Sequence, residues 1–139
     1  MVRRPSPGGS FAGEPRAAVS DSIVISVDAM GGDHGPPVVV SGVELALKRL
    51  KGRDVRFLLH GSAAGLKAEL ARHPAARAAS EIRPTELVIG MEDKPAQALR
   101  RGKGTSLWNA VEAVREGAAQ AAVSAGNTGA LMAISKLIL

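Results

Sequence analysis

Short apolar runs alternate with longer helical patterns along the sequence, and this alternation limits the fold more than any other feature. Runs with the length of buried strands occur at Ile23–Val27, Val55–Leu59 and Ala121–Val123, with one or two shorter ones at Ile82 and Leu87–Ile89. Strands separated by helices at this spacing favour a mainly parallel sheet with right-handed crossovers. We therefore expect an α/β fold.

Helical patterns fill the intervals between the runs. Pro36 or Pro37 suits the first turn of a helix over 38–50. A second helix is expected over 63–72, and Pro74 is expected to end it.

The second half of the chain continues the alternation. Residues 94–104 are basic and contain glycine, which predicts a loop with a helical turn at 96–100. Thr105 or Ser106 can cap a helix that runs to Glu116. From Thr128 onward the pattern is helical again.

The two ends of the chain differ from its middle. Residues 1–21 are rich in Pro, Gly, Ser and Arg and lack the apolar surface that would offset their ordering entropy, so we expect a disordered tail there. Residues 22–139 are expected to form the α/β part. The last helix, 130–139, is apolar and has no polar end. We infer that the chain is the N-terminal portion of a longer protein, with an incomplete sheet.

Composition excludes several classes of site. The 139 residues include no cysteine, which excludes disulfides, thiolate metal sites and a cysteine nucleophile, and which fits a reducing cytoplasm. No apolar run approaches the roughly 18–20 residues that cross a bilayer. The N-terminal residues lack the apolar core of a secretory signal.

Positive charge is concentrated in two stretches of a chain whose formal net charge is +5. Residues 94–103 carry Lys94, Arg100, Arg101 and Lys103 and no acid, and residues 48–56 carry five cations and one acid. Such stretches suit a phosphate or an acidic protein, and they also suit a solvated face. No aromatic residue lies between the basic ones, so nucleic-acid binding is not expected.

One segment near the C-terminus has the pattern of a strand that turns into a helix and holds an anion. Helix N-termini present unpaired N–H groups and a partial positive charge, and ligands of parallel sheets lie at the carboxyl ends of strands. Gly126 and Gly129 let an anion approach the backbone, and Ser124, Asn127 and Thr128 add side-chain donors. A capped helix without a ligand explains the same residues.

A second glycine-rich loop follows the first strand. Asp28 ends that strand, and Gly31 and Gly32 permit close backbone approach. Asp33 beside His34 can act as an acid/base pair. A metal site is not expected, because the other histidines lack ligand spacing. A turn whose carboxylates bond backbone amides explains the same residues. If both strands are central, the two loops open on one edge of the sheet and form one crevice.

Three motifs occur in order and at consistent spacing: Ile25-x-Val27-Asp28-Ala-Met-Gly-Gly-Asp-x-Gly-Pro36, Met91-x-Asp93-x-Pro95-x-x-Ala98-x-Arg100 and Val123-Ser-Ala-Gly-Asn-Thr-Gly-Ala-Leu-Met-Ala133. Together they resemble the phosphate acyltransferase family of phospholipid synthesis. The resemblance covers about 23–139 and the N-terminal portion of the family's members. Two segments depart from the family pattern: Thr105–Trp108, where paired serines and a methionine are usual, and His60–Ser62, where an acidic residue commonly follows the glycine.

The resemblance implies a Rossmann-like, three-layer α/β/α sandwich with a mainly parallel sheet, usually in a homodimer. It implies a reaction in which inorganic phosphate attacks the thioester of a fatty acyl-acyl carrier protein. The products are acyl phosphate and free carrier protein. A cytoplasmic enzyme, with peripheral membrane association known in the family, is implied, and neither a cofactor nor a metal is.

Under this hypothesis the candidate residues form three groups. The catalytic candidates are Asn127, Asp33 and His34. Phosphate or substrate binding is expected from Asp28, Gly31, Gly32, Ser124, Gly126, Thr128 and Gly129. The residues expected to meet the acyl carrier protein are Arg100, Arg101 and Lys103. Two alternatives remain open: a phosphotransacetylase-like enzyme, and a non-catalytic fragment that binds anions or the carrier protein.

Overall fold

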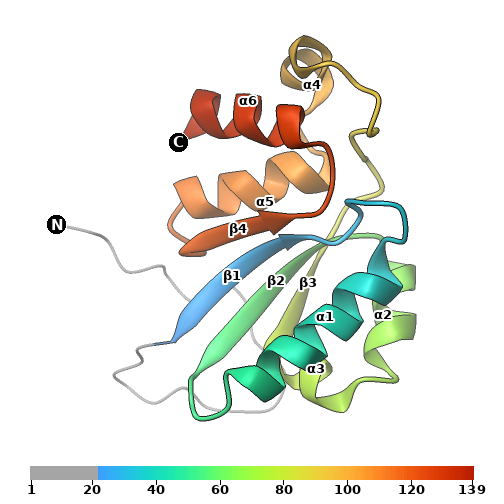
Figure 1. The fold of residues 1–139 in the computed structure, drawn as a ribbon, viewed down its shortest axis with the longest axis vertical. Helices are drawn as coiled ribbons and strands as arrows, with labels where there is room; N and C mark the ends of the chain where they lie inside the picture. The colour runs from blue at the N-terminus through green and yellow to red at the C-terminus, as the bar shows by residue number, and fades with distance from the viewer. Residues whose placement is uncertain (1–21) are drawn as a thin grey trace, which may run out of the picture.

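The computed structural model describes residues 22–139, and all strands of this part form one parallel sheet (Figure 1). The strands are β1 (Ile23–Asp28), β2 (Val55–Gly61), β3 (Ser80–Pro84) and β4 (Ala121–Ser124). Their order in the sheet is β3-β2-β1-β4. The predicted parallel α/β architecture is confirmed, while the predicted disorder of 1–21 lies outside the described residues.

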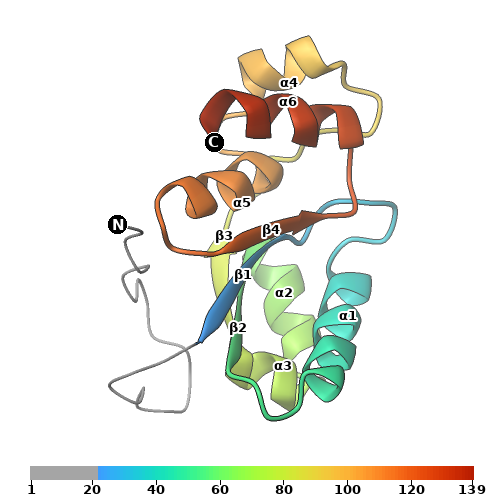
Figure 2. The same ribbon diagram turned by 60° about the vertical axis from the view of Figure 1, so that its left-hand side comes forward.

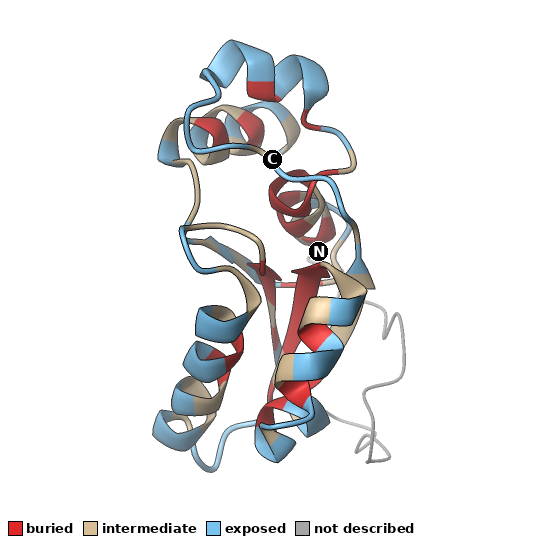
Figure 3. Cartoon of the chain, turned by 90° about the vertical axis from the view of Figure 1, so that its right-hand side faces the viewer, coloured by how far each residue is buried: buried red, intermediate tan, exposed pale blue. Residues whose placement is uncertain are grey.

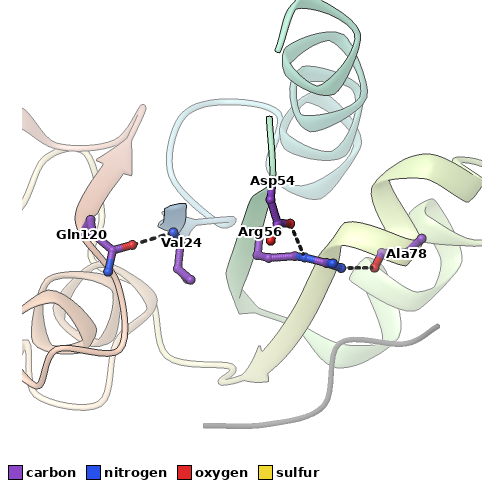
Figure 4. Close-up of polar contacts among 5 residues, drawn as sticks. All are labelled: Val24, Asp54, Arg56, Ala78 and Gln120. Carbon is purple, nitrogen blue, oxygen red and sulfur yellow. Dashed lines mark hydrogen bonds and ion pairs between the residues drawn. The ribbon is translucent and has the colours of Figure 1, made fainter. Parts of the chain in front are cut away.

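Strand β1 is central because both of its edges are paired. Asp28 is level with His60 of β2 on one side and with Ser124 of β4 on the other. At the opposite end of the sheet, the Val24 amide donates to the Gln120 side chain (2.6 Å, Figure 4). This register brings the last residues of β1, β2 and β4 to one edge.

Three helices cover one face of the sheet: α1 (Pro36–Arg49), α2 (Ala63–Leu70) and α3 (Pro74–Ala79). Their apolar residues pack on the β-branched and aromatic side chains of β1 and β2, with Val40, Val43 and Leu66 buried against Phe57 and Leu59. Figure 3 shows that the buried positions of α1 lie on the side that is turned to the sheet. Burial of this aliphatic surface is what holds the layer in place.

The other face carries α5 (Ser106–Arg115), and α4 (Pro95–Arg101) and α6 (Thr128–Ile138) pack beyond it (Figure 2). Ala113 of α5 packs with Val24 and Leu58 of the sheet. Trp108 and Val111 lie in a separate cluster with residues of α4 and α6. Helix α5 is therefore buried on two sides, and helices on both faces of the sheet give the three layers of a Rossmann-like sandwich.

Three local expectations need correction. The helix expected over 63–72 ends at Leu70, and Pro74 opens α3, because a proline at the first helical position loses no intrahelical bond. The segment 87–89 forms no strand; the Leu87 carbonyl instead accepts from the Ser106 amide at the start of α5. The stretch expected to be mostly loop contains the seven-residue helix α4.

Candidate functional site

The two predicted loops leave the sheet at its topological switch point. Strand β1 continues into α1 on one face, and its neighbour β4 continues into α6 on the other (Figure 1). Chains that diverge from adjacent parallel strands leave a crevice at the carboxyl edge, where ligands of open α/β sheets bind. The sequence predicts both loops on one edge if both strands are central. In the described sheet β4 is an edge strand, but its parallel pairing with β1 still brings both loops to one edge.

Direct hydrogen bonds join the two loops. The Ser124 hydroxyl donates to Oδ2 of Asp28 (2.8 Å) and accepts from the Gly126 amide (3.0 Å). The other carboxylate oxygen of Asp28 accepts from the Met30 amide (3.1 Å). Asp28 is only 4% exposed, so these donors replace the water that a buried carboxylate needs. The pair fixes the ends of β1 and β4 relative to one another.

The glycines of both loops allow this close approach. A Cβ atom on Gly31 would lie 2.7 Å from Oδ2 of Asp28 and 2.8 Å from the Gly126 nitrogen. A Cβ atom on Gly126 would lie 3.3 Å from the Gly31 Cα atom. Gly32 has φ +83°, a conformation that side chains disfavour. The structure therefore brings Gly31, Gly32 and Gly126 together. The contact between the two loops is enough to explain why glycine occupies positions 31 and 126.

Asn127 caps α6 and holds a distant segment. Its Oδ1 accepts from the Ala130 amide (3.1 Å), so Asn127 is the N-cap. Its Nδ2 lies within hydrogen-bonding distance of three carbonyl oxygens, those of Asp93 (2.7 Å), Gly90 (3.1 Å) and Met91 (3.3 Å). The segment 90–93 therefore lies beside the first turn of α6.

The first turn of α6 provides the remaining donors. Thr128 and Gly129 are its first two residues, and the amides at these positions have no partner within a helix. Thr128 is exposed. A Cβ atom on Gly129 would lie 3.2 Å from Pro95, so this glycine also lets α4 pack closely. The Ser124 hydroxyl, by contrast, is already bonded to Asp28.

Comparison with known proteins decides the family. Residues 23–139 match the model of a family described as "Fatty acid synthesis protein". The chain belongs to this family. Proteins named phosphate acyltransferase share the same region: that of Caulobacter vibrioides is 69% identical over 121 residues, which are 87% of this chain and 33% of that protein.

Two further relatives carry the same name. The protein of Phenylobacterium zucineum is 63% identical over 87% of this chain and 34% of its own length. The protein of Maricaulis maris is 56% identical over 83% of this chain and 33% of its own length. The resemblance to phosphate acyltransferases is thus confirmed, and the chain spans about a third of the length of these curated relatives.

In this member of the fatty acid synthesis protein family, the remaining candidates lie at the rim. Asp33 and His34 are exposed in the loop between β1 and α1, and the structure gives their side chains no hydrogen bond within residues 22–139. They are not joined to the bonded pair formed by Asp28 and Ser124. Their catalytic role stays a prediction.

The predicted carrier-protein contacts lie on and just after α4. Arg100, Arg101 and Lys103 are all exposed. Arg101 also lines a pocket of about 200 Å³ between α4 and the preceding segment, together with six further residues: Val88, Ile89, Asp93, Gln97, Ala98 and Thr105. Arg101 therefore lines the same pocket as Asp93, a residue of the segment that Asn127 holds.

His60 is a buried polar residue that the sequence patterns did not select as a site residue. Its Nε2 lies 2.8 Å from the Ser26 hydroxyl of the neighbouring strand. Burial, with a smaller contribution from the positive charge of Arg83, lowers the pKa of His60 to about 4. Only the register of β1 and β2 pairs this imidazole with a hydroxyl, so no local pattern could have identified it.

The described part of the chain contains neither a cluster of metal ligands nor a membrane-spanning helix. In residues 22–139, no three His, Asp or Glu side chains gather closely enough to hold a metal ion. No helix in the same range has the length and apolar character needed to cross a membrane.

Proposed function

We propose that this chain forms the phosphate-binding part of an acyltransferase of fatty acid and phospholipid synthesis. In the proposed reaction, inorganic phosphate and fatty acyl-acyl carrier protein give acyl phosphate and free carrier protein. The observation that carries the proposal is the junction of the two motif loops at the switch point, in a chain that shares 69% identity with a protein named phosphate acyltransferase.

The chemistry requires no nucleophile from the protein. A phosphate oxygen attacks the thioester carbon, the carbon–sulfur bond breaks, and the proton of hydrogen phosphate goes to the departing thiolate. The protein must hold the phosphate, orient it and stabilise the oxyanion that forms on the thioester carbonyl. In this proposal, Asp33 and His34 are the candidates for moving the proton, and no cofactor or metal takes part.

The amides of Thr128 and Gly129 are the proposed phosphate donors. Both belong to the first turn of an eleven-residue helix, whose partial positive charge favours an anion. The buried carboxylate of Asp28 lies on the inner side of the loops and would repel a phosphate there. Gly31, Gly32, Ser124 and Gly126 then act by fixing the turn.

The exposed cations Arg100, Arg101 and Lys103 are the proposed contact with the acidic carrier protein. Arg100 and Arg101 lie in the last turn of α4 and Lys103 follows it, and α4 packs against α6 through Ala98. A carrier protein bound there would bring its thioester to the same end of the sheet as the phosphate turn. We extend the proposal to a cytoplasmic homodimer with peripheral contact to the membrane.

The test is a phosphate-dependent acyl-transfer assay on the complete gene product. We expect release of free carrier-protein thiol that requires inorganic phosphate, together with formation of acyl phosphate. If acetyl-coenzyme A is a better acyl donor than fatty acyl-acyl carrier protein, the result would favour the phosphotransacetylase-like alternative. Binding of carrier protein without transfer would favour the non-catalytic one.

Charge reversal tests the contact surface. The double change Arg100→Glu with Arg101→Glu should raise the KM for acyl carrier protein, and added salt should reduce the difference from wild type. The matched control reverses two exposed cations near α2, Lys67→Glu with Arg72→Glu. Equal KM values for both double variants would show that Arg100 and Arg101 belong to an ordinary solvent-exposed surface and not to a carrier-protein contact.

A further inference from the structure

Asn127 uses its whole side chain within the protein. Its Oδ1 accepts from the Ala130 amide, and the two hydrogens of Nδ2 are shared among three carbonyl oxygens. The orientation follows from these partners, because a carboxamide turned by 180° would place its oxygen against three other oxygens. No hydrogen of this amide is left for a substrate.

The segment that Asn127 holds has little else to order it. Residues 90–93 are all exposed. Within the segment, the Gly90 amide donates to Oδ2 of Asp93 (2.9 Å) and the Asp93 amide donates to the Gly90 carbonyl (3.2 Å). These two bonds close a small turn, and within residues 22–139 the hydrogen bonds that attach this turn to α6 come from Asn127.

We propose that Asn127 is a positioning residue, which fixes segment 90–93 as a wall beside the phosphate-binding first turn of α6. This inference rests on the proposed function and replaces direct substrate contact as the role of Asn127. The wall lies beside the phosphate turn and directly precedes α4 in the chain. The last turn of α4 carries Arg100 and Arg101, the cations that would meet the acyl donor. Its loss would leave each substrate site intact and disturb the alignment of the two reactants, which affects kcat more than KM.

A serine at position 127 separates the two uses of the side chain. Asn127→Ser keeps a good N-cap for α6 but is too short to reach the 90–93 carbonyls, whereas Asn127→Ala removes both functions. We expect Asn127→Ser to speed amide hydrogen exchange at Gly90 and Asp93 by about tenfold while α6 stays protected. The matched control is Asn109→Ser, because the Asn109 side chain also donates to a backbone carbonyl, that of Gly104 (3.2 Å), which lies outside segment 90–93.

The kinetic test uses the complete gene product. Asn127→Ser should lower kcat by roughly ten- to a hundredfold and leave the KM for inorganic phosphate within about twofold. Asp93→Ala, which opens the 90–93 turn from its other side, should lower the same kcat. The kcat of the double variant should be no lower than that of the more impaired single variant, because both changes disrupt the same turn.

Each outcome decides the proposal. Unchanged exchange at Gly90 and Asp93 in Asn127→Ser would overturn it, as would faster exchange with an unchanged kcat. Effects of Asn127→Ser and Asp93→Ala that multiply would indicate that Asn127 touches the reacting groups. If the wild-type protein transfers no acyl group, the proposed function fails, and the positioning role fails with it. Hydrogen exchange then still shows whether Asn127 holds segment 90–93 in place.

Discussion

The Ser124 hydroxyl donates a 2.8 Å hydrogen bond to Oδ2 of Asp28, ninety-six positions earlier in the chain. The bond joins the ends of β1 and β4, from which the chain leaves toward opposite faces of the sheet. Without it, a buried carboxylate would lose its side-chain donor, and the two loops would lose a direct link. The predicted binding site therefore depends on a contact inside the protein before any ligand binds.

Removal of this donor should destabilise the fold. Ser124→Ala leaves Oδ2 of the buried Asp28 without its hydroxyl partner, and we expect the free energy of unfolding to fall by about 2 kcal/mol. Urea unfolding followed by circular dichroism measures this loss. Ser41→Ala on the exposed face of α1 is the control and should change stability by less than about 0.5 kcal/mol. Equal losses in both variants would show that the Ser124–Asp28 bond contributes nothing.

The close approach of the loops predicts opposite effects for two glycine substitutions. Gly31→Ala places a methyl group 2.8 Å from the Gly126 nitrogen, and we expect a loss of about 2 kcal/mol as the loops separate. Gly42→Ala has open space around it within α1 and should stabilise the protein by about 1 kcal/mol. Thermal unfolding of the two variants compares the shifts. A stabilised Gly31→Ala variant would contradict the tight junction.

The pKa of His60 predicts a pH dependence of stability. In the unfolded chain the imidazole titrates near 6.5, and in the folded protein its pKa is about 4. Between these values the unfolded state binds more protons, so stability rises with pH across this window and is fully present above it. The difference between the two pKa values corresponds to about 3 kcal/mol of unfolding free energy. Urea midpoints measured from pH 4 to 7 should show this rise, and His60→Gln should lose that part of the slope; the same slope in both proteins would refute it.

Neighbouring hydroxyls at the start of α5 predict contrasting results. Thr105 caps the helix by accepting from the Trp108 amide (3.3 Å), so Thr105→Ala should cost about 1 kcal/mol of stability. The Ser106 hydroxyl is fully buried and has no hydrogen-bond partner in the described structure. Ser106→Ala should therefore leave stability unchanged or raise it by up to about 1 kcal/mol. A larger loss for Ser106→Ala than for Thr105→Ala in chemical denaturation would reverse this assignment.

Much of the fold could be predicted from local sequence. The β-branched run of β1, the cap at Thr105 and the cap at Asn127 act through residues within one turn of each other, so their effects are visible in a short window. The same reasoning failed at two places. Pro74 could end one helix or begin the next, and the apolar run 87–89 could form a strand or a loop. Contacts with α1 and α5 decided between them.

The candidate site was only partly predictable for a related reason. Glycines and polar residues after strands indicate a loop at the carboxyl edge, and two such loops were found in the sequence. Whether they meet depends on strand order, and β3-β2-β1-β4 places β4 beside β1 rather than beside β3. The partners of Asn127 and the neutral, buried state of His60 follow from that arrangement.

By itself the sequence determined the alternation of strands and helices, the family, and the residue types at the switch point, because these depend on local backbone preferences and on motif spacing. Only the tertiary structure decided that Asp28 bonds Ser124 and that Asn127 holds segment 90–93. Residues separated by dozens of positions become neighbours through the pairing of strands and the packing of helices. That pairing is set by the burial of apolar surface over the whole sheet, which no single motif contains.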